Sequence, residues 1–133
     1  MQPVVFADIE AALADHLAAA LAARGVTVPV QLDVPNPRPT RFVRLVRVGG
    51  TKSNLITDRP RIVLECWDAL GTGASDLAAL VRALVTALAP GNMSGIWVDK
   101  VIDMGMVYRP DPGTNLPRYL VTAELHVKGA ALT

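Results

Sequence analysis

The stretch RPTRFVRLVRVGGTKSNLITDRPRIVLECW, from Arg38 to Trp67, decides the fold prediction for this chain. Residues 41–48 and 62–67 within it are rich in Val, Leu and Ile. Their side chains can be assigned alternately to the two faces of an extended strand, so they predict two β-strands. The loop between them, Gly49 to Arg59, is longer than a tight hairpin needs. Loops of that length are often functional or mobile.

The first of these strands has apolar residues on both of its faces. Phe42 and Val46 would point to one side of a sheet, and Val43 and Leu45 to the other. Only one side can meet the core of the domain. Another subunit is the simplest cover for the second side.

Positive charge is concentrated in the same stretch. Asp58 is the only acid among residues 38–61, and the seven cations there are Arg38, Arg41, Arg44, Arg47, Lys52, Arg59 and Arg61. The window therefore carries +6 in a chain whose formal net charge is +1. This asymmetry predicts nucleic acid or an acidic protein rim as a partner, because both phosphates and carboxylates bind Arg. The alternative is a solvated strand pair whose charges discourage aggregation.

The flanking sequence predicts the remaining elements. Ile9, Leu13, Leu17 and Leu21 recur every four residues and indicate a helix over about 4–24, with Pro3 at its start. A second helix should begin at a Ser75 cap, after a turn at Gly71 and Gly73, and bury the stripe from Leu77 to Leu88. Strands are expected at 28–34, where Pro29 favours an edge position, at 96–106, and at 118–128. The predicted fold is α+β, a mixed and mostly antiparallel sheet with two helices packed on one face.

No motif in the chain predicts catalysis. His16, His126 and the single cysteine, Cys66, lie far apart in sequence, so we expect no metal site and no cofactor. Cys66 alternates with core residues, as a buried cysteine does. Asp99 and Asp103 would share one face of a strand, which indicates a solvated face rather than an acid–base pair. We therefore expect that the chain is not an enzyme.

Length and hydropathy are consistent with one globular domain over residues 1–133. The first residues contain no basic region followed by an apolar run, so we expect no secretory signal. No uncharged apolar stretch reaches 18 residues, so we expect no membrane span. Half of the residues are hydrophobic, which predicts an apolar surface and self-association.

Several segments together resemble the tail terminator proteins of long, flexible-tailed bacteriophages. They are the Ala-rich first helix, RPTRFVRLVRVGG at 38–50, DRPRIVLECWD at 58–68, ASDLAALVRALVTAL in the second helix and PDPGTNLPRYLVTAELHVKG at 110–129. The resemblance implies a non-catalytic virion protein that forms a homo-oligomeric, six-fold ring on the head-proximal end of the tail tube. Such a ring stops tube polymerisation and offers a surface to the head-completion protein, and genome DNA passes through its channel.

The resemblance also implies the partners and the location. The partners would be the chain itself, the major tail tube protein, the head-completion or connector protein and genome DNA, with assembly in the host cytoplasm. Residues assigned to partner or channel contact are Arg41, Arg44, Arg47, Lys52, Arg59 and Arg61. Two alternatives stay open, namely another neck or head–tail connector protein and a small nucleic-acid-binding module.

Overall fold

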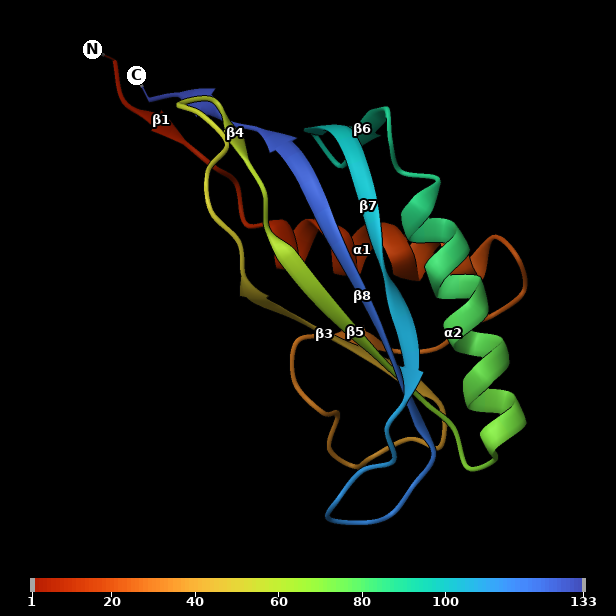
Figure 1. The fold of residues 1–133 in the computed structure, drawn as a ribbon. Helices are drawn as coiled ribbons and strands as arrows, with labels where there is room; N and C mark the ends of the chain where they lie inside the picture. Colours follow the sequence, from red (N-terminus) through yellow and green to blue (C-terminus); the bar gives the residue numbers. More distant parts are fainter. Residues whose placement is uncertain (1, 133) are drawn as a thin grey trace.

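The structure, a computed structural model, describes residues 2–132 and is built on a curled β-sheet (Figure 1). Its two helices are α1 (Ile9–Ala22) and α2 (Gly71–Thr86). The seven strands of the sheet are β2 (Val30–Gln31), β3 (Phe42–Gly49), β4 (Thr57–Asp58), β5 (Arg61–Trp67), β6 (Gly91–Met93), β7 (Ile96–Tyr108) and β8 (Arg118–Lys128). A separate two-stranded ribbon joins β1 (Val4–Val5) to β9 (Ala130–Ala131).

The strand order is β2-β3-β5-β8-β7-β6, and β4 pairs with one end of β8. Every pairing is antiparallel except that of β2 with β3, which is parallel. This confirms the predicted α+β fold with a mixed, mostly antiparallel sheet. The two predicted strands of the Arg38–Trp67 stretch are β3 and β5, and they pair along nearly their whole length.

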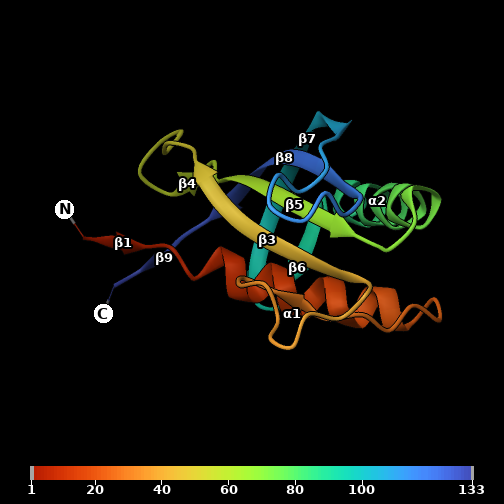
Figure 2. The same ribbon diagram turned by 90° about the horizontal axis from the view of Figure 1, so that it is seen from below.

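Both helices pack on the same, concave face of the sheet, as predicted. Figure 2 shows α1 running beneath β3, while α2 lies along the direction of β7 (Figure 1). The first helix buries Leu13, Leu17 and Leu21, and the second buries Leu77, Val81 and Val85. From β8 the core receives Val121, Ala123, Leu125 and Val127, as the alternation predicts. Each fully buried Leu or Val contributes about 1.5–3 kcal/mol.

The first helix begins later than the sequence predicts. It starts at Ile9, whereas Val4 and Val5 are extended and pair with β9. The side chain of Asp8 accepts a hydrogen bond from the backbone N–H of Ala11 at 3.2 Å and thereby caps the helix. The predicted start at Pro3 is therefore wrong, because an Asp cap and a strand partner outweigh the helical propensity of the preceding residues.

The second helix begins earlier than predicted, and Ser75 does not cap it. Its first residue is Gly71, and Leu70 precedes it without a side-chain cap. The turn before it is held by Asp68, whose carboxylate accepts a hydrogen bond from the N–H of Ala69 at 2.6 Å. A side chain at Gly73 would collide with the Asp68 carboxylate. The two glycines therefore form the first turn of the helix rather than a loop before it.

Two register irregularities in β7 change which of its residues face the helices. They fall between Val98 and Lys100 and between Asp103 and Met106, so Gly105 lies in a bulge as predicted. Asp103 consequently sits opposite core residue Ala123, and its carboxylate accepts a hydrogen bond from Arg82 of α2 at 3.0 Å. The shift between Val98 and Lys100 therefore removes the predicted shared face for Asp99 and Asp103, although both residues are solvent-exposed as predicted.

The chain itself covers one end of the outer face of the sheet. Phe42 stacks on Trp67 with ring centroids 5.1 Å apart, and both side chains are buried. The guanidinium groups of Arg38 and Arg118 lie over the Trp67 ring at 4.8 and 5.2 Å. A second subunit is therefore not needed to cover Phe42, although Val48 farther along β3 remains 53% exposed.

No helix within residues 2–132 combines the length and the apolar character that crossing a membrane requires.

Candidate functional site: a basic arm beside the chain ends

Most arginines of the basic window are paired with acids of the same chain. Three of these acids lie outside the window, so the pairs form only in the folded structure. The shortest N–O distances are 3.8 Å for Arg38–Asp111, 3.1 Å for Arg41–Asp68, 2.8 Å for Arg44–Glu65 and 2.9 Å for Arg47–Asp58.

These pairs change the charge that a partner would meet. Seven cations against these four acids leave a balance of +3. Within residues 2–132, three cations of the window have no acid within salt-bridge distance, namely Lys52, Arg59 and Arg61. Of the six residues assigned to partner contact, Arg41, Arg44 and Arg47 thus also hold the fold together, and their side chains are 30–33% exposed.

The three unpaired cations lie on residues 50–61, which we call the basic arm. The arm folds back on itself, since Arg59 donates hydrogen bonds to the carbonyl and the hydroxyl oxygen of Thr51 at 3.3 and 3.0 Å. A turn at its tip is fixed by the side-chain oxygen of Asn54, which accepts from the N–H groups of Ile56 and Thr57. The arm is therefore an ordered projection.

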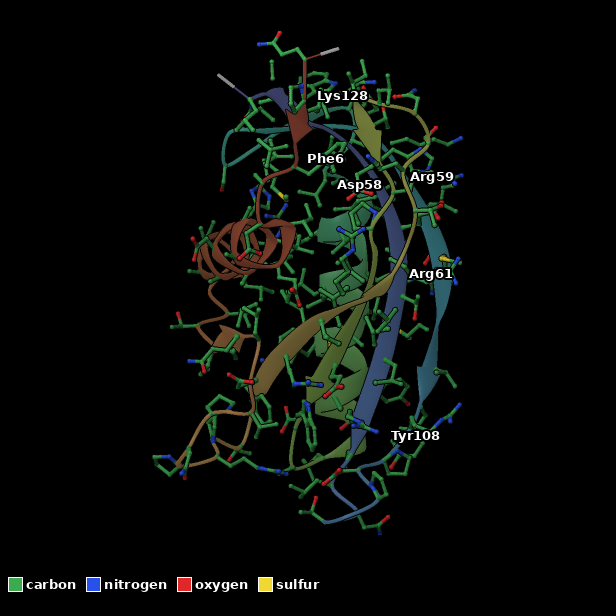
Figure 3. The ribbon with its side chains drawn as sticks, turned by 90° about the vertical axis from the view of Figure 1, so that its left-hand side faces the viewer. Phe6, Asp58, Arg59, Arg61, Tyr108 and Lys128 are labelled. Carbon is green, nitrogen blue, oxygen red and sulfur yellow. The ribbon has the colours of Figure 1, made fainter. Side chains whose placement is uncertain are left out.

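Contacts with the end of β8 place the basic arm beside the β1–β9 ribbon. Gly129 donates its N–H to the carbonyl of Ile56 at 2.9 Å, and Lys128 Nζ donates to Thr57 Oγ1 at 2.8 Å. A hollow of about 220 Å³ between arm and ribbon is lined by Gln2, Pro3, Val4, Lys52 and Leu55. In Figure 3 Arg59 and Arg61 lie on the side of the sheet away from α1.

The tip of the basic arm is apolar, a feature that the distribution of charge does not predict. Leu55 is 58% exposed and Ile56 is 50% exposed, next to the cations. The sequence does contain a sign of this apolar tip, since two large apolar residues stand next to each other within a polar loop. Apolar residues surrounded by charged ones are typical of protein–protein interfaces, whereas binding to phosphates requires cations alone.

The other candidate chemical groups do not converge. Cys66 is fully buried, and this burial raises the pKa of its thiol. His126 Nε2 lies 3.1 Å from Glu124 Oε2 on the outer face of β8, and His16 lies on α1. In the part of the chain that the structure describes, no three His, Cys, Asp or Glu side chains gather as metal ligands do.

Comparisons with known proteins find similarity of fold and none of sequence family. No protein-family model and no curated protein sequence matches the chain. Among solved structures, the fold is similar to that of a chain in the virion of a native gene transfer agent (GTA) particle, with a TM-score of 0.64 and 22% sequence identity. The alignment covers 91% of this chain and 95% of the other. The fold of this chain is therefore similar to that of the other over nearly the full length of both.

Proposed function

We propose that the chain is a structural, non-catalytic subunit of a phage-like virion. The observation that carries this proposal is the fold shared with a chain of a gene transfer agent virion, over nearly the full length of both chains. The absence of any convergent polar motif in the sequence is consistent with this role.

Within such a particle, the role we propose is that of a tail terminator. A ring of these subunits would cap the head-proximal end of the tail tube, stop its polymerisation and offer the surface that joins the head. The supporting observation is the resemblance of the segments at 38–50, 58–68 and 110–129, which include β3, β5 and β8. These strands are neighbours in the sheet, so the resemblance follows one continuous part of the fold.

We assign contact with the tube rim or with channel DNA first to Lys52, Arg59 and Arg61. They lack an acidic partner among the described residues, and they lie on an ordered projection. Arg41, Arg44 and Arg47 would reach a partner through their exposed parts only. The exposed Leu55 and Ile56 favour a protein rim over DNA.

Deletion of the gene from the genome that carries it tests the role. Negative-stain images should show tails of irregular, extended length that lack heads, and expression of the chain in trans should restore normal particles. Tails of normal length without heads would instead indicate another connector protein of the neck. Normal, infectious particles would contradict the proposal.

Charge reversal tests the site. We expect that Lys52→Glu, Arg59→Glu and Arg61→Glu together prevent complementation of the deletion while the subunit remains folded. A matched control is the triple variant Arg24→Glu, Lys100→Glu and Arg109→Glu, which changes the net charge equally at other exposed cations. If the arm variant complements as well as the control does, the assignment of these three residues is wrong. Salt-dependent binding of DNA by the isolated subunit, lost in the arm variant alone, would favour the nucleic-acid-binding alternative.

A further inference from the structure

Most of one side of β7 has no strand partner within residues 2–132. Strand β6 pairs only with Ile96–Val98, so the segment from Asp99 to Tyr108 is paired with β8 on one side and, within residues 2–132, with no strand on the other. The outward N–H and C=O groups of such an edge form a template for an added strand.

The side chains at the Met104–Tyr108 end of this edge are apolar, whereas Asp99, Lys100 and Asp103 are the charged residues of its other part. Met104, Val107 and Tyr108 have 42, 45 and 48% of their surface accessible, and no residue from Met104 to Tyr108 is charged. A hollow of about 450 Å³ adjoins the edge and is lined by Met106 and by Ala79, Arg82, Ala83, Thr86 and Ala87 of α2. An exposed, apolar edge strand of this length is a site of association.

The opposite edge of the sheet is protected, which makes the free edge of β7 distinctive. There α1 packs beside β3, and the carboxylate of Glu10 accepts the outward N–H of Arg47 at 3.0 Å. A carboxylate from α1 thus satisfies an outward backbone N–H group of β3. On Met104–Tyr108 the corresponding contact is local, since Gly105 donates its N–H to Asp103 Oδ1 at 3.1 Å, and no described strand pairs with the outer side of this segment.

The β1–β9 ribbon offers a complementary element. It projects from the body of the molecule (Figures 1 and 2), and β1 has β9 on one side and no described strand on the other. Val5 and Leu132 on the ribbon are 51 and 55% exposed. Figure 3 shows Phe6, at the base of the ribbon, and Tyr108, on the β7 edge, at opposite ends of the molecule.

Contact between these two regions buries no charged side chain. Neither residues 3–7 and 129–132 of the ribbon nor Met104–Tyr108 carry a charged side chain, so no charge is buried when they pair. Beside the ribbon, the basic arm carries the unpaired cations Lys52, Arg59 and Arg61. Beside the free edge, Arg82 of α2 is paired with Asp103, and Arg109 follows Tyr108 directly.

We propose that the β1–β9 ribbon of one copy of this chain adds, as a strand, to the free edge of β7 in a second copy. The two surfaces are different and lie at opposite ends of the molecule, so the contact is head-to-tail and leaves one free ribbon and one free edge at each step. Such a contact produces a ring when the rotation between copies closes. The contact itself is independent of the proposed function, and only the closure of the ring rests on that function.

A complementation experiment between two variants tests this contact without knowledge of its register. The edge variant is Met104→Lys with Val107→Lys, and the ribbon variant is Val5→Lys with Leu132→Lys. The control is Leu70→Lys, at a residue that is 69% exposed and lies on neither surface. Circular dichroism and cooperative unfolding establish that each variant is folded, and the single substitutions Met104→Lys and Val5→Lys replace any double variant that is not. Mass is measured by light scattering over a range of concentrations.

We expect the unaltered chain and the control to form multimers, and the edge and ribbon variants each to assemble at least tenfold more weakly. An equimolar mixture of the two variants should form one-to-one dimers and nothing larger, because only one intact ribbon and one intact edge remain between them. The proposal is overturned if the ribbon variant still assembles fully, if the mixture stays monomeric, or if the unaltered chain is monomeric at every concentration. Loss of tail-length control on gene deletion is independent of these outcomes, so failure of the contact and failure of the proposed function are distinguishable.

Discussion

Arg47 and Asp58 form a doubly hydrogen-bonded ion pair, with Nη1–Oδ2 and Nη2–Oδ1 distances of 2.9 and 3.3 Å. Asp58 is only 5% exposed and also accepts the N–H of Arg59, so the base of the basic arm depends on this carboxylate. The only acid of the basic window therefore serves to fix the loop that carries the unpaired cations.

Removal of this carboxylate should destabilise the fold. Asp58→Asn leaves Arg47 without its counter-charge, and we expect the free energy of unfolding to fall by about 2–3 kcal/mol. Asp15→Asn, at an exposed acid of α1 without a salt bridge among the described residues, should change it by less than about 0.5 kcal/mol. Urea unfolding monitored by circular dichroism measures both, and equal effects would contradict a structural role for the pair.

The charge-reversed arm should, in contrast, be nearly as stable as the unaltered chain. Lys52 and Arg61 are exposed and unpaired among the described residues, and the side chain of Arg59 donates its hydrogen bonds to Thr51, so Lys52→Glu, Arg59→Glu and Arg61→Glu together should cost about 1 kcal/mol or less. Reversal of Arg44 should cost more, because Glu65, its partner at 2.8 Å, is buried. A thermal melt of each variant provides the comparison, and a larger loss for the arm triple would contradict the division of the cations into two groups.

The two tryptophans should report on different environments. Trp67 is 3% exposed beneath two guanidinium groups, whereas Trp97 is 46% exposed. In Trp97→Phe protein, fluorescence should be blue-shifted and resist acrylamide quenching, and in Trp67→Phe protein it should be red-shifted and strongly quenched. Trp67→Ala should lower the free energy of unfolding by about 3–5 kcal/mol, through loss of the stack on Phe42. Equal quenching in the two Phe variants would contradict the buried position of Trp67.

Cys66 should make stability depend on pH in the alkaline range. Burial raises the pKa of its thiol above the ordinary value of 9.0, so the folded chain keeps the proton while the unfolded chain loses it. The unfolded state binds fewer protons above pH 9, and the free energy of unfolding should fall as pH rises. Between pH 8 and pH 10 this contribution falls by about 1.4 kcal/mol. Cys66→Ala protein should lack it, and parallel pH profiles for the two proteins would show that the thiol ionises in the folded state.

The sequence predicts those elements whose periodicity is strong. Strands β3, β5 and β8 follow from residues alternating at a period of two, and the core stripe of α2 follows from helical spacing. The pattern does not predict β1 or β9, because strands of two residues are defined by their pairing and Val4 meets Ala131 from the other end of the chain. The bulges of β7 likewise depend on its partner β8.

The candidate site could be predicted only in part. The concentration of cations is visible in the sequence, but the acids that neutralise Arg41 and Arg44 come from the far end of β5 and from the residue after it. Their proximity is a property of the register between β3 and β5. Linear charge counting therefore overstated the charge available to a partner.

The ribbon also brings the two ends of the described chain together, since Gln2 Nε2 donates to the carbonyl of Leu132 at 3.4 Å. A short peptide linking these ends would close the backbone without displacing a strand, and a new opening could be cut in the exposed turn between β7 and β8. Circularly permuted chains of this kind would free the ribbon from any tag. A fluorescent or affinity label could then be attached at the opposite end of the molecule, and its position in an assembled particle would reveal which way each subunit points.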